Sequence, residues 1–284
     1  MTTIKVRAAA LALLAVTGCD METPPPPPFH TGESSFALLP SARWRLPGRL
    51  NEISGLARAP DGRFFAHGDE QAIIYEIGPD EGRLLSAFAL GDPVLRDDFE
   101  DIAAAPNGDL YAVTSGGLVF RFRPGADGAR VDAQRFDTRL SETCEVEGAA
   151  FDPQSGSLIL ACKQSYDRAM RSTTALYEWA PGQERATLWR EFRERDLAQA
   201  AGVENFHPSA IAFDARTDRW LLLAGRERAL VEFDNRGRIL AARTLERGHR
   251  QPEAMALTAE GALLIADEAA GERALLTIYP RADQ

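Results

Sequence analysis

The sequence predicts an all-β fold, a single β-propeller with five blades, and two observations carry this prediction. Five segments repeat one pattern: a polar head, a strand of small apolar residues, a turn containing Gly or Asp, a second apolar strand and a third, alternating strand. The repeats recur at roughly 45–50 residues, the spacing of four-stranded propeller blades. In addition, the last repeat lacks a fourth strand, which the segment 41–48 can supply. Such pairing of the two ends of the domain would close the ring and remove free sheet edges.

The five repeats start at residues 51, 97, 144, 206 and 250. The first four each carry a further strand-like stretch, at 83–90, 130–137, 186–192 and 238–245. One helix-like stretch, 192–202, is inserted between the third and fourth repeats. We therefore expect one propeller domain over 36–284. Six blades would require two of them between Glu147 and Ser209, which is too short a segment, and an all-β sandwich is the alternative fold.

The first 35 residues predict export and a membrane anchor. Residues 1–18 join a short basic leader to an apolar run of signal-peptide length, too short for a transmembrane helix. The run ends in VTGC, which resembles the lipobox of bacterial lipoproteins, so we expect cleavage before Cys19 and lipidation of that residue. Asp20 resembles a signal for retention at the inner membrane. Residues 19–35 predict a linker whose five consecutive prolines form a stiff spacer. The expected location is the periplasmic side of the cell envelope.

The charge balance limits the partners of the chain. Lys and Arg number 32 and Asp and Glu number 42, which gives a formal net charge of −10. An acidic chain without a basic stripe is a poor candidate for nucleic acid or for an anionic bilayer, so we expect no nucleic-acid partner and membrane contact through the lipid only. The balance suits a cation or a basic partner, although net acidity also serves solubility alone.

Two cysteines remain once Cys19 is assigned to lipid. Cys144 and Cys162 fall near the same end of one predicted hairpin. In an oxidising periplasm such a pair predicts a disulfide, and two separate buried thiols are the alternative.

The repeats predict an acidic site at one mouth of the central channel. In a propeller, the loop that enters the innermost strand and the hairpin between the second and third strands lie on the same face. Closely packed carboxylates without a Cys/His cluster favour Ca²⁺ or Mg²⁺, and the alternative is a hydrated rim in which each Glu caps backbone N–H groups. The candidate metal ligands are Glu52, Glu100, Glu147, Glu253, Asp69 and Asp267. The candidate contacts to an organic ligand are Asp98, Glu145, Arg226 and Glu268.

Two further residues of this face are candidates for catalysis. The chain contains only two lysines, Lys5 and Lys163, and uses arginine for its other cations. A lysine kept at the channel mouth predicts a role for its compact, titratable ammonium, although a single case also arises by chance. His207 enters the fourth repeat and is a candidate general base, with a structural hydrogen bond as the alternative role.

The repeat heads resemble the SdiA-regulated family of bacterial propeller proteins. The resemblance covers roughly 48–279 and rests on NEISGL at 51–56, DFEDI at 98–102, CEVEGAAF at 144–151, PSAIAF at 208–213 and PEAMAL at 252–257. It implies a propeller in the cell envelope and does not imply an activity. The acidic mouth more distantly resembles those of phytase-like and esterase-like propellers, in which Ca²⁺ is held at the channel.

Two functions follow as hypotheses. The first is a cell-envelope lipoprotein whose acidic mouth binds a divalent cation and a small ligand or protein partner. The second is a Ca²⁺- or Mg²⁺-dependent hydrolase of a phosphoester or lactone, with Lys163 or a Glu as proton carrier. Three or more carboxylates within metal-ligand reach beside a concave pocket would favour the second hypothesis, and dispersed acids would favour the first.

Overall fold

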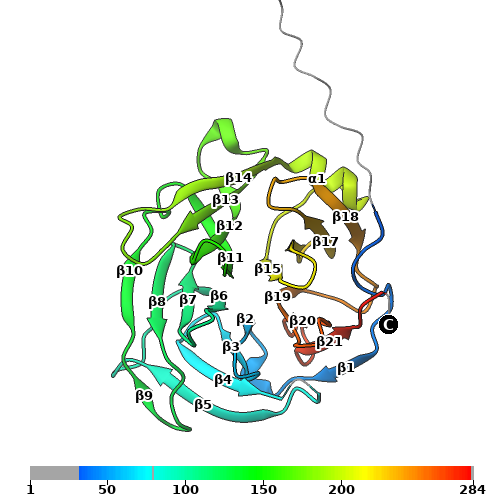
Figure 1. Cartoon of the computed structure of the whole chain (residues 1–284). Coiled ribbons are helices and arrows are strands. Elements are labelled where there is room, and N and C mark those ends of the chain that lie inside the picture. Colours follow the sequence, from blue (N-terminus) through cyan, green and yellow to red (C-terminus); the bar gives the residue numbers. More distant parts are fainter. Residues whose placement is uncertain (1–31, 79, 283–284) are drawn as a thin grey trace, which may run out of the picture.

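The computed structural model describes residues 32–78 and 80–282 and shows a ring of β-sheets (Figure 1). Within these residues the strands form five sheets, of which one has five strands and the others have four. Neighbouring strands are antiparallel, except that β9 runs parallel to β5. The five-bladed all-β propeller predicted from the repeats is therefore confirmed.

Each blade is defined by its strands, given from the channel outward. Blade 1 contains β2 (Ile53–Arg58), β3 (Phe64–Gly68), β4 (Ile73–Ile77), β5 (Leu84–Leu90) and β9 (Arg130–Val131). Blade 2 contains β6 (Phe99–Ala104), β7 (Leu110–Thr114), β8 (Leu118–Phe122) and β10 (Gln134–Asp137). Blade 3 contains β11 (Cys144–Asp152), β12 (Ser157–Ser165), β13 (Thr173–Trp179) and β14 (Thr187–Arg193). Blade 4 contains β15 (Ala210–Asp214), β16 (Arg219–Ala224), β17 (Ala229–Phe233) and β18 (Ile239–Thr244).

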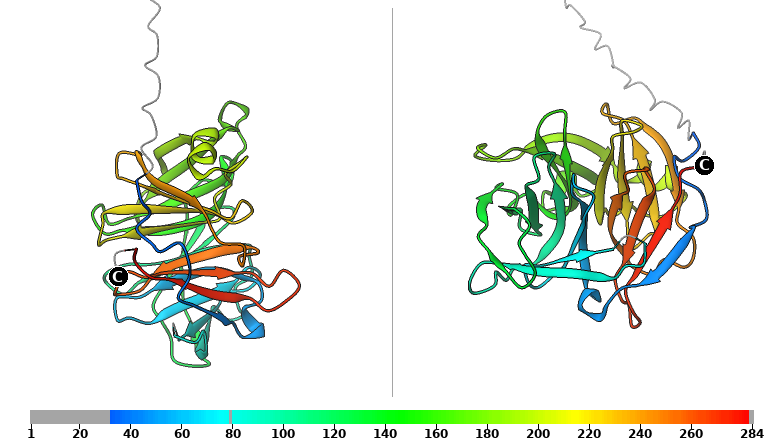
Figure 2. Two further views of the ribbon diagram at one scale, coloured as in Figure 1. Left: turned by 90° about the vertical axis from the view of Figure 1, so that its right-hand side faces the viewer. Right: turned by 60° about the horizontal axis from the view of Figure 1, so that its bottom comes forward.

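Blade 5 combines the two ends of the domain. It contains β19 (Pro252–Leu257), β20 (Leu263–Asp267) and β21 (Leu275–Tyr279), and β1 (Ala42–Arg45) is its outermost strand. β1 pairs antiparallel with β21, and Ala42 lies opposite Ile278. The side views in Figure 2 show the N-terminal segment running beside the C-terminal strand on the outside of the ring.

Hydrophobic clusters between neighbouring blades form the core. One cluster lies at each of the five blade-to-blade junctions within the described residues, including the junction between blades 5 and 1. Alternating apolar residues of each strand pack against one neighbouring blade or the other, which is why both faces of a blade are apolar. Trp179, Trp220 and Tyr279 are the largest of the fully buried side chains.

Helical segments lie in the connections. The α-helix α1 (Glu194–Ala201) follows β14, as the stretch 192–202 predicted, and packs Leu197 into the junction between blades 3 and 4. Two 3₁₀ helices cover Gly48–Leu50 and Arg168–Met170. Among the residues that the structure describes, no helix is long and apolar enough to span a membrane.

The predicted signal peptide, Cys19 and Asp20 lie outside the described residues, and so does most of the predicted linker. The last part of that linker already contacts blade 4. Gly32 N donates to Leu240 O at 2.8 Å, and the hydroxyl groups of Ser34 and Ser35 each donate to the buried Glu232 carboxylate at 2.6 Å. The first blade contacts therefore begin before residue 36.

Candidate functional site

A β-bulge places the residue at the head of the innermost strand in four of the five blades. The pairing of the first two strands skips one residue there, namely Ser54 in blade 1, Glu100 in blade 2, Glu147 in blade 3 and Glu253 in blade 5. A bulge leaves its extra residue out of the ladder and redirects the side chain. The same local irregularity therefore presents three glutamates at one mouth of the channel.

The two serines of this register bond to the neighbouring blade. Ser54 Oγ donates to Glu100 O at 3.2 Å, and Ser209 Oγ donates to Pro252 O at 3.0 Å. In blades 1 and 4 this position therefore links blades to one another. The three glutamates are the charged residues of this register.

Lys163 is a cation among these glutamates. Its Nζ donates to Glu147 Oε1 at 2.7 Å and lies 3.9 Å from Glu145 Oε1. Burial alone would lower the pKa of Lys163, but the hydrogen bond with Glu147 and the charges of Glu145 and Glu253 raise it instead. The ammonium therefore stays charged and partly neutralises carboxyls from more than one blade.

The glutamates hold protons near neutral pH. Burial, followed by the charges of Glu147 and Asp98, raises the pKa of Glu100 to about 9, against the opposing charge of Lys163. Burial raises the pKa of Glu147 to about 7 although its hydrogen bond with Lys163 opposes the rise. Burial likewise raises the pKa of Glu253 to about 7, with Lys163 and Gln251 opposing it. Bringing a cation to this cluster would therefore release protons.

A second pair of carboxyls lies beside this cluster. Glu268 lies close to Glu52, and burial followed by the interaction with Glu52 raises the pKa of Glu268 to about 8, with smaller contributions from Glu253 and Asp69. Gln251 Nε2 donates to Glu268. The nearby Glu52 carboxyl thus disfavours the charged form of Glu268.

The remaining predicted residues occupy different surroundings. Asp98 is exposed and accepts a hydrogen bond of 2.7 Å from Ser115 Oγ. Arg226 is exposed, with no ion pair or side-chain hydrogen bond to any residue in the described ranges. His207 bonds through Nδ1 to Glu227 Oε1 at 2.7 Å, and its Nε2 lies 3.9 Å from Glu194 Oε1. The carboxyl neighbours of His207 are thus not those of Lys163.

Asp267 differs from its predicted place as a rim ligand. Its carboxylate is 1% exposed, lies 2.7 Å from His249 Nδ1 and accepts a hydrogen bond of 2.9 Å from Arg250 N. His249 in turn bonds through Nε2 to Tyr279 Oη at 2.7 Å, within the interior of blade 5. Both oxygens of Asp267 are therefore engaged in an internal network. In that hairpin, the carboxyl that lies near the other acids of the mouth is that of the next residue, Glu268.

Asp101 is a buried acid that the sequence did not single out. It follows the bulged Glu100, is 2% exposed, and accepts hydrogen bonds of 2.8 Å each from Ile102 N and from Ala149 N of the next blade. Burial raises its pKa well above the usual range, against these bonds. It satisfies backbone donors on the channel side of two innermost strands. Its position one residue after the rim glutamate was the available signal.

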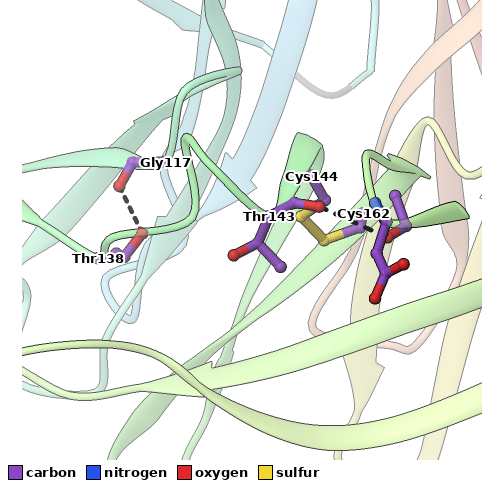
Figure 3. Close-up of a disulfide and its surroundings, with 7 residues drawn as sticks. Gly117, Thr138, Thr143, Cys144 and Cys162 are labelled. Atoms are coloured by element: carbon purple, nitrogen blue, oxygen red, sulfur yellow. Dashed lines mark hydrogen bonds between the residues drawn. A yellow bond between two sulfur atoms is a disulfide. The ribbon is translucent and has the colours of Figure 1, made fainter. Parts of the chain in front are cut away.

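A disulfide joins β11 and β12 at this end of blade 3. Cys144 and Cys162 are bonded, and both are buried (Figure 3). Each cysteine directly precedes a residue of the mouth, Glu145 on one strand and Lys163 on the other. The bond therefore ties together the two strands that carry the Lys163–Glu147 pair.

Metal binding at the mouth stays a prediction. Among residues 32–78 and 80–282, no three His, Cys, Asp or Glu side chains are grouped in an arrangement that could hold a metal ion. The carboxyls predicted as ligands are instead distributed between Lys163, the Glu52–Glu268 contact and the network of His249.

The fold is that of a five-bladed β-propeller, and one mouth of its channel places Lys163 beside glutamates. A family model described as SdiA-regulated matches residues 41–271, and the chain belongs to that family. The comparison with curated proteins gave no match.

Solved structures confirm the fold class. Glutaminyl cyclase from Myxococcus xanthus is 13% identical, with a TM-score of 0.57 over 86% of this chain and 97% of that one. The PQQ-bound aldose sugar dehydrogenase from Streptomyces coelicolor is also 13% identical, with a TM-score of 0.52 over 86% of this chain and 99% of that one. At these identities the likeness concerns the fold alone.

Proposed function

We propose that this protein is a cell-envelope lipoprotein whose propeller binds a small ligand or a protein partner at the acidic mouth. The observation that carries the proposal is the cluster of Glu100, Glu147 and Glu253 around Lys163, contributed by three different blades. Partly protonated carboxyls and an ammonium offer both hydrogen-bond donors and acceptors. They suit a ligand that carries hydroxyl or amino groups.

A divalent cation is the second component of this proposal. Ca²⁺ or Mg²⁺ would be held by oxygens of the mouth glutamates and would displace their protons. We place binding ahead of hydrolysis because Lys163 already supplies a fixed cation among these carboxyls. The hydrolase hypothesis called for three carboxyls gathered as metal ligands beside a concave pocket.

The test is thermal stability and metal content of the purified protein with Ca²⁺, with Mg²⁺ and with EDTA, at pH 6 and pH 8. We expect a stoichiometric metal to raise Tm more at pH 8, where the glutamates have lost their protons, and Glu147→Gln to abolish the rise. Exposed Glu142→Gln is the matched control. No bound metal and no change in Tm would overturn the cation component. A pull-down or ligand screen with the parent protein and Glu147→Gln then tests the partner component by itself.

The anchor is tested separately. Cys19→Ser is expected to move the protein from the membrane fraction to the soluble periplasmic fraction, and Asp20→Ser to move it from the inner to the outer membrane. Unchanged fractionation of Cys19→Ser would refute lipidation as the attachment. The outcome at the acidic mouth does not depend on this result.

A further inference from the structure

The end of the channel opposite the acidic mouth contains a cavity. It has a volume of about 300 Å³ and is lined by the innermost strands of all five blades. Three residues beyond each mouth position stands an alanine, and the five are Ala57, Ala103, Ala150, Ala212 and Ala256. These alanines are buried, and each also belongs to the hydrophobic cluster of one blade-to-blade junction.

The lining of this cavity is mixed, with polar backbone groups and arginine side chains beside apolar side chains. The next residue of each innermost strand is only half-buried, and in three blades it is Phe151, Phe213 or Leu257. Each of these three side chains also packs against the hydrophobic cluster of a neighbouring junction, so only part of its surface is left for contact with a ligand.

Two arginines lie at the same opening. Arg58 ends β2, and its side chain makes no hydrogen bond or ion pair with any residue that the structure describes. The guanidinium of Arg216 reaches only Ala259 O, at 3.4 Å. Neither guanidinium has the bidentate carboxylate partner that arginine accommodates best.

The acids near this opening leave the two arginines available. Asp214 is buried and bonded to Arg281 Nη1 at 2.5 Å and to Thr217 Oγ1 at 2.6 Å. Glu260 is exposed, and hydrogen bonds from its own backbone and from Thr258 lower its pKa, with smaller effects from the charges of Arg58 and Arg216. One exposed carboxylate thus faces two guanidiniums, and the opening has a positive balance.

We propose that this cavity binds a small amphipathic carboxylate. The apolar body of the ligand enters the space lined by the five alanines, and its carboxylate bonds to Arg58 and Arg216 at the opening. A volume of about 300 Å³ is at the small end of ligand pockets, which fits a medium-chain aliphatic acid or an acid with one ring. The site is independent of the proposed function of the acidic mouth.

The experiment is isothermal titration of octanoate, below its micellar concentration, into the purified protein in detergent-free buffer. We expect one site, and affinity at least about tenfold lower in the double variant Arg58→Gln/Arg216→Gln because two charge-assisted bonds are lost. Ala104→Leu, which narrows the opening without removing charge, is expected to weaken binding too. The matched control is Arg83→Gln/Arg195→Gln, which neutralises two exposed arginines elsewhere and leaves the affinity unchanged.

Octylammonium and Lys163→Gln distinguish the two ends of the channel. Octylammonium has the same tail and the opposite charge, so it is expected not to bind at the arginine opening. Lys163→Gln is expected to bind octanoate as the parent does. The proposal is overturned if octanoate does not bind at one site, if the double arginine variant binds as tightly as the parent, or if Lys163→Gln is the variant that loses binding.

Discussion

The two ends of the central channel are built from the same five strands and differ in chemistry. At one end, bulged residues present Glu100, Glu147 and Glu253 to Lys163. At the other end, regular pairing continues and alanines line a cavity beside arginines that lack carboxylate partners. The comparison teaches that bulges of one residue at the strand heads turn glutamates toward one mouth, while the regular pairing that follows places small residues around the cavity at the other.

The two ends also differ in the interactions that hold their strands together. The acidic mouth is fastened by the disulfide between Cys144 and Cys162, and its carboxyls are coupled to one another across blades. The cavity end relies on close packing of small residues. Perturbing each end by itself therefore tests whether they are independent.

The largest loss of stability is expected when the disulfide between Cys144 and Cys162 is removed. Its cysteines are 18 residues apart, and a loop of about this length is stabilised by roughly 3 kcal/mol when closed. Cys144→Ala/Cys162→Ala is expected to lower the free energy of unfolding by about 2–4 kcal/mol in urea titrations. Reductant should reproduce the loss in the parent and do nothing to the variant. Equal stability of parent and variant in the absence of reductant would contradict a stabilising bond.

The next effect concerns the close contact between the innermost strands of blades 3 and 4. A Cβ on Gly148 would lie 2.9 Å from Ile211 N and 3.0 Å from Ala210 C of the next blade. Because this neighbour is backbone, Gly148→Ala is expected to cost about 2 kcal/mol in thermal or chemical unfolding. Gly116→Ala, where a Cβ meets nothing within 4 Å, is the control and should be close to neutral. A neutral Gly148→Ala would mean that the blades can move apart there.

A smaller effect on stability is expected to distinguish Lys163 at the acidic mouth from Arg58 at the cavity end. Lys163→Gln leaves the buried Glu147 carboxylate without its partner and is expected to cost about 1–2 kcal/mol at pH 8, a figure reduced because Lys163 is partly exposed. Since the pKa of Glu147 is about 7, the cost should shrink at pH 5, where Glu147 is protonated in either protein. Arg58→Gln should change stability by less than about 0.5 kcal/mol at either pH. Equal losses of stability in Lys163→Gln and Arg58→Gln would contradict the expected difference between the two ends.

The smallest effect is a dependence of folding stability on pH that is caused by Glu100. Its pKa is about 9 in the folded protein against an ordinary value of 4.5, so the folded state holds more protons between these pH values. Stability contributed by this group is therefore lost as pH rises from about 4.5 to about 9. Glu100→Gln removes the ionisation and is expected to be about 1 kcal/mol more stable than the parent near pH 9 and equal to it near pH 5. This figure is discounted well below the full effect of the pKa shift because Glu100 is only partly buried and water screens its charge. Parallel stability curves from pH 5 to pH 9 would refute the shift.

The sequence predicted the fold well because blade repeats are local patterns. Each strand and turn is encoded within one repeat, and the missing strand of the last repeat pointed to 41–48, where β1 pairs with β21. The position of Glu100, Glu147 and Glu253 at one mouth followed from the same register. Side-chain direction within that register was harder to predict. In the run DDFED, alternation alone does not show that Glu100 faces the mouth while Asp101 is buried, because the bulge shifts the alternation by one residue.

Asp267 and Glu268 show the same limit at a hairpin. Both are acids at the end of β20, and only the structure places Asp267 against His249 inside blade 5 and leaves Glu268 beside Glu52. His249 gave no signal in the sequence because its partners, Asp267 and Tyr279, are 18 and 30 residues away.

By itself the sequence determined the five blades, the strand that completes the last of them, and the acids at the strand heads, because each depends on spacing within one repeat. Only the tertiary structure decided that Lys163 lies among carboxyls from blades 2, 3 and 5, that Cys144 and Cys162 are bonded, and that the opposite end of the channel holds a cavity with two arginines. The physical reason is that these features arise where blades converge. The protonation of the mouth residues and the size of the cavity depend on burial and on distances between blades, which no local sequence pattern contains.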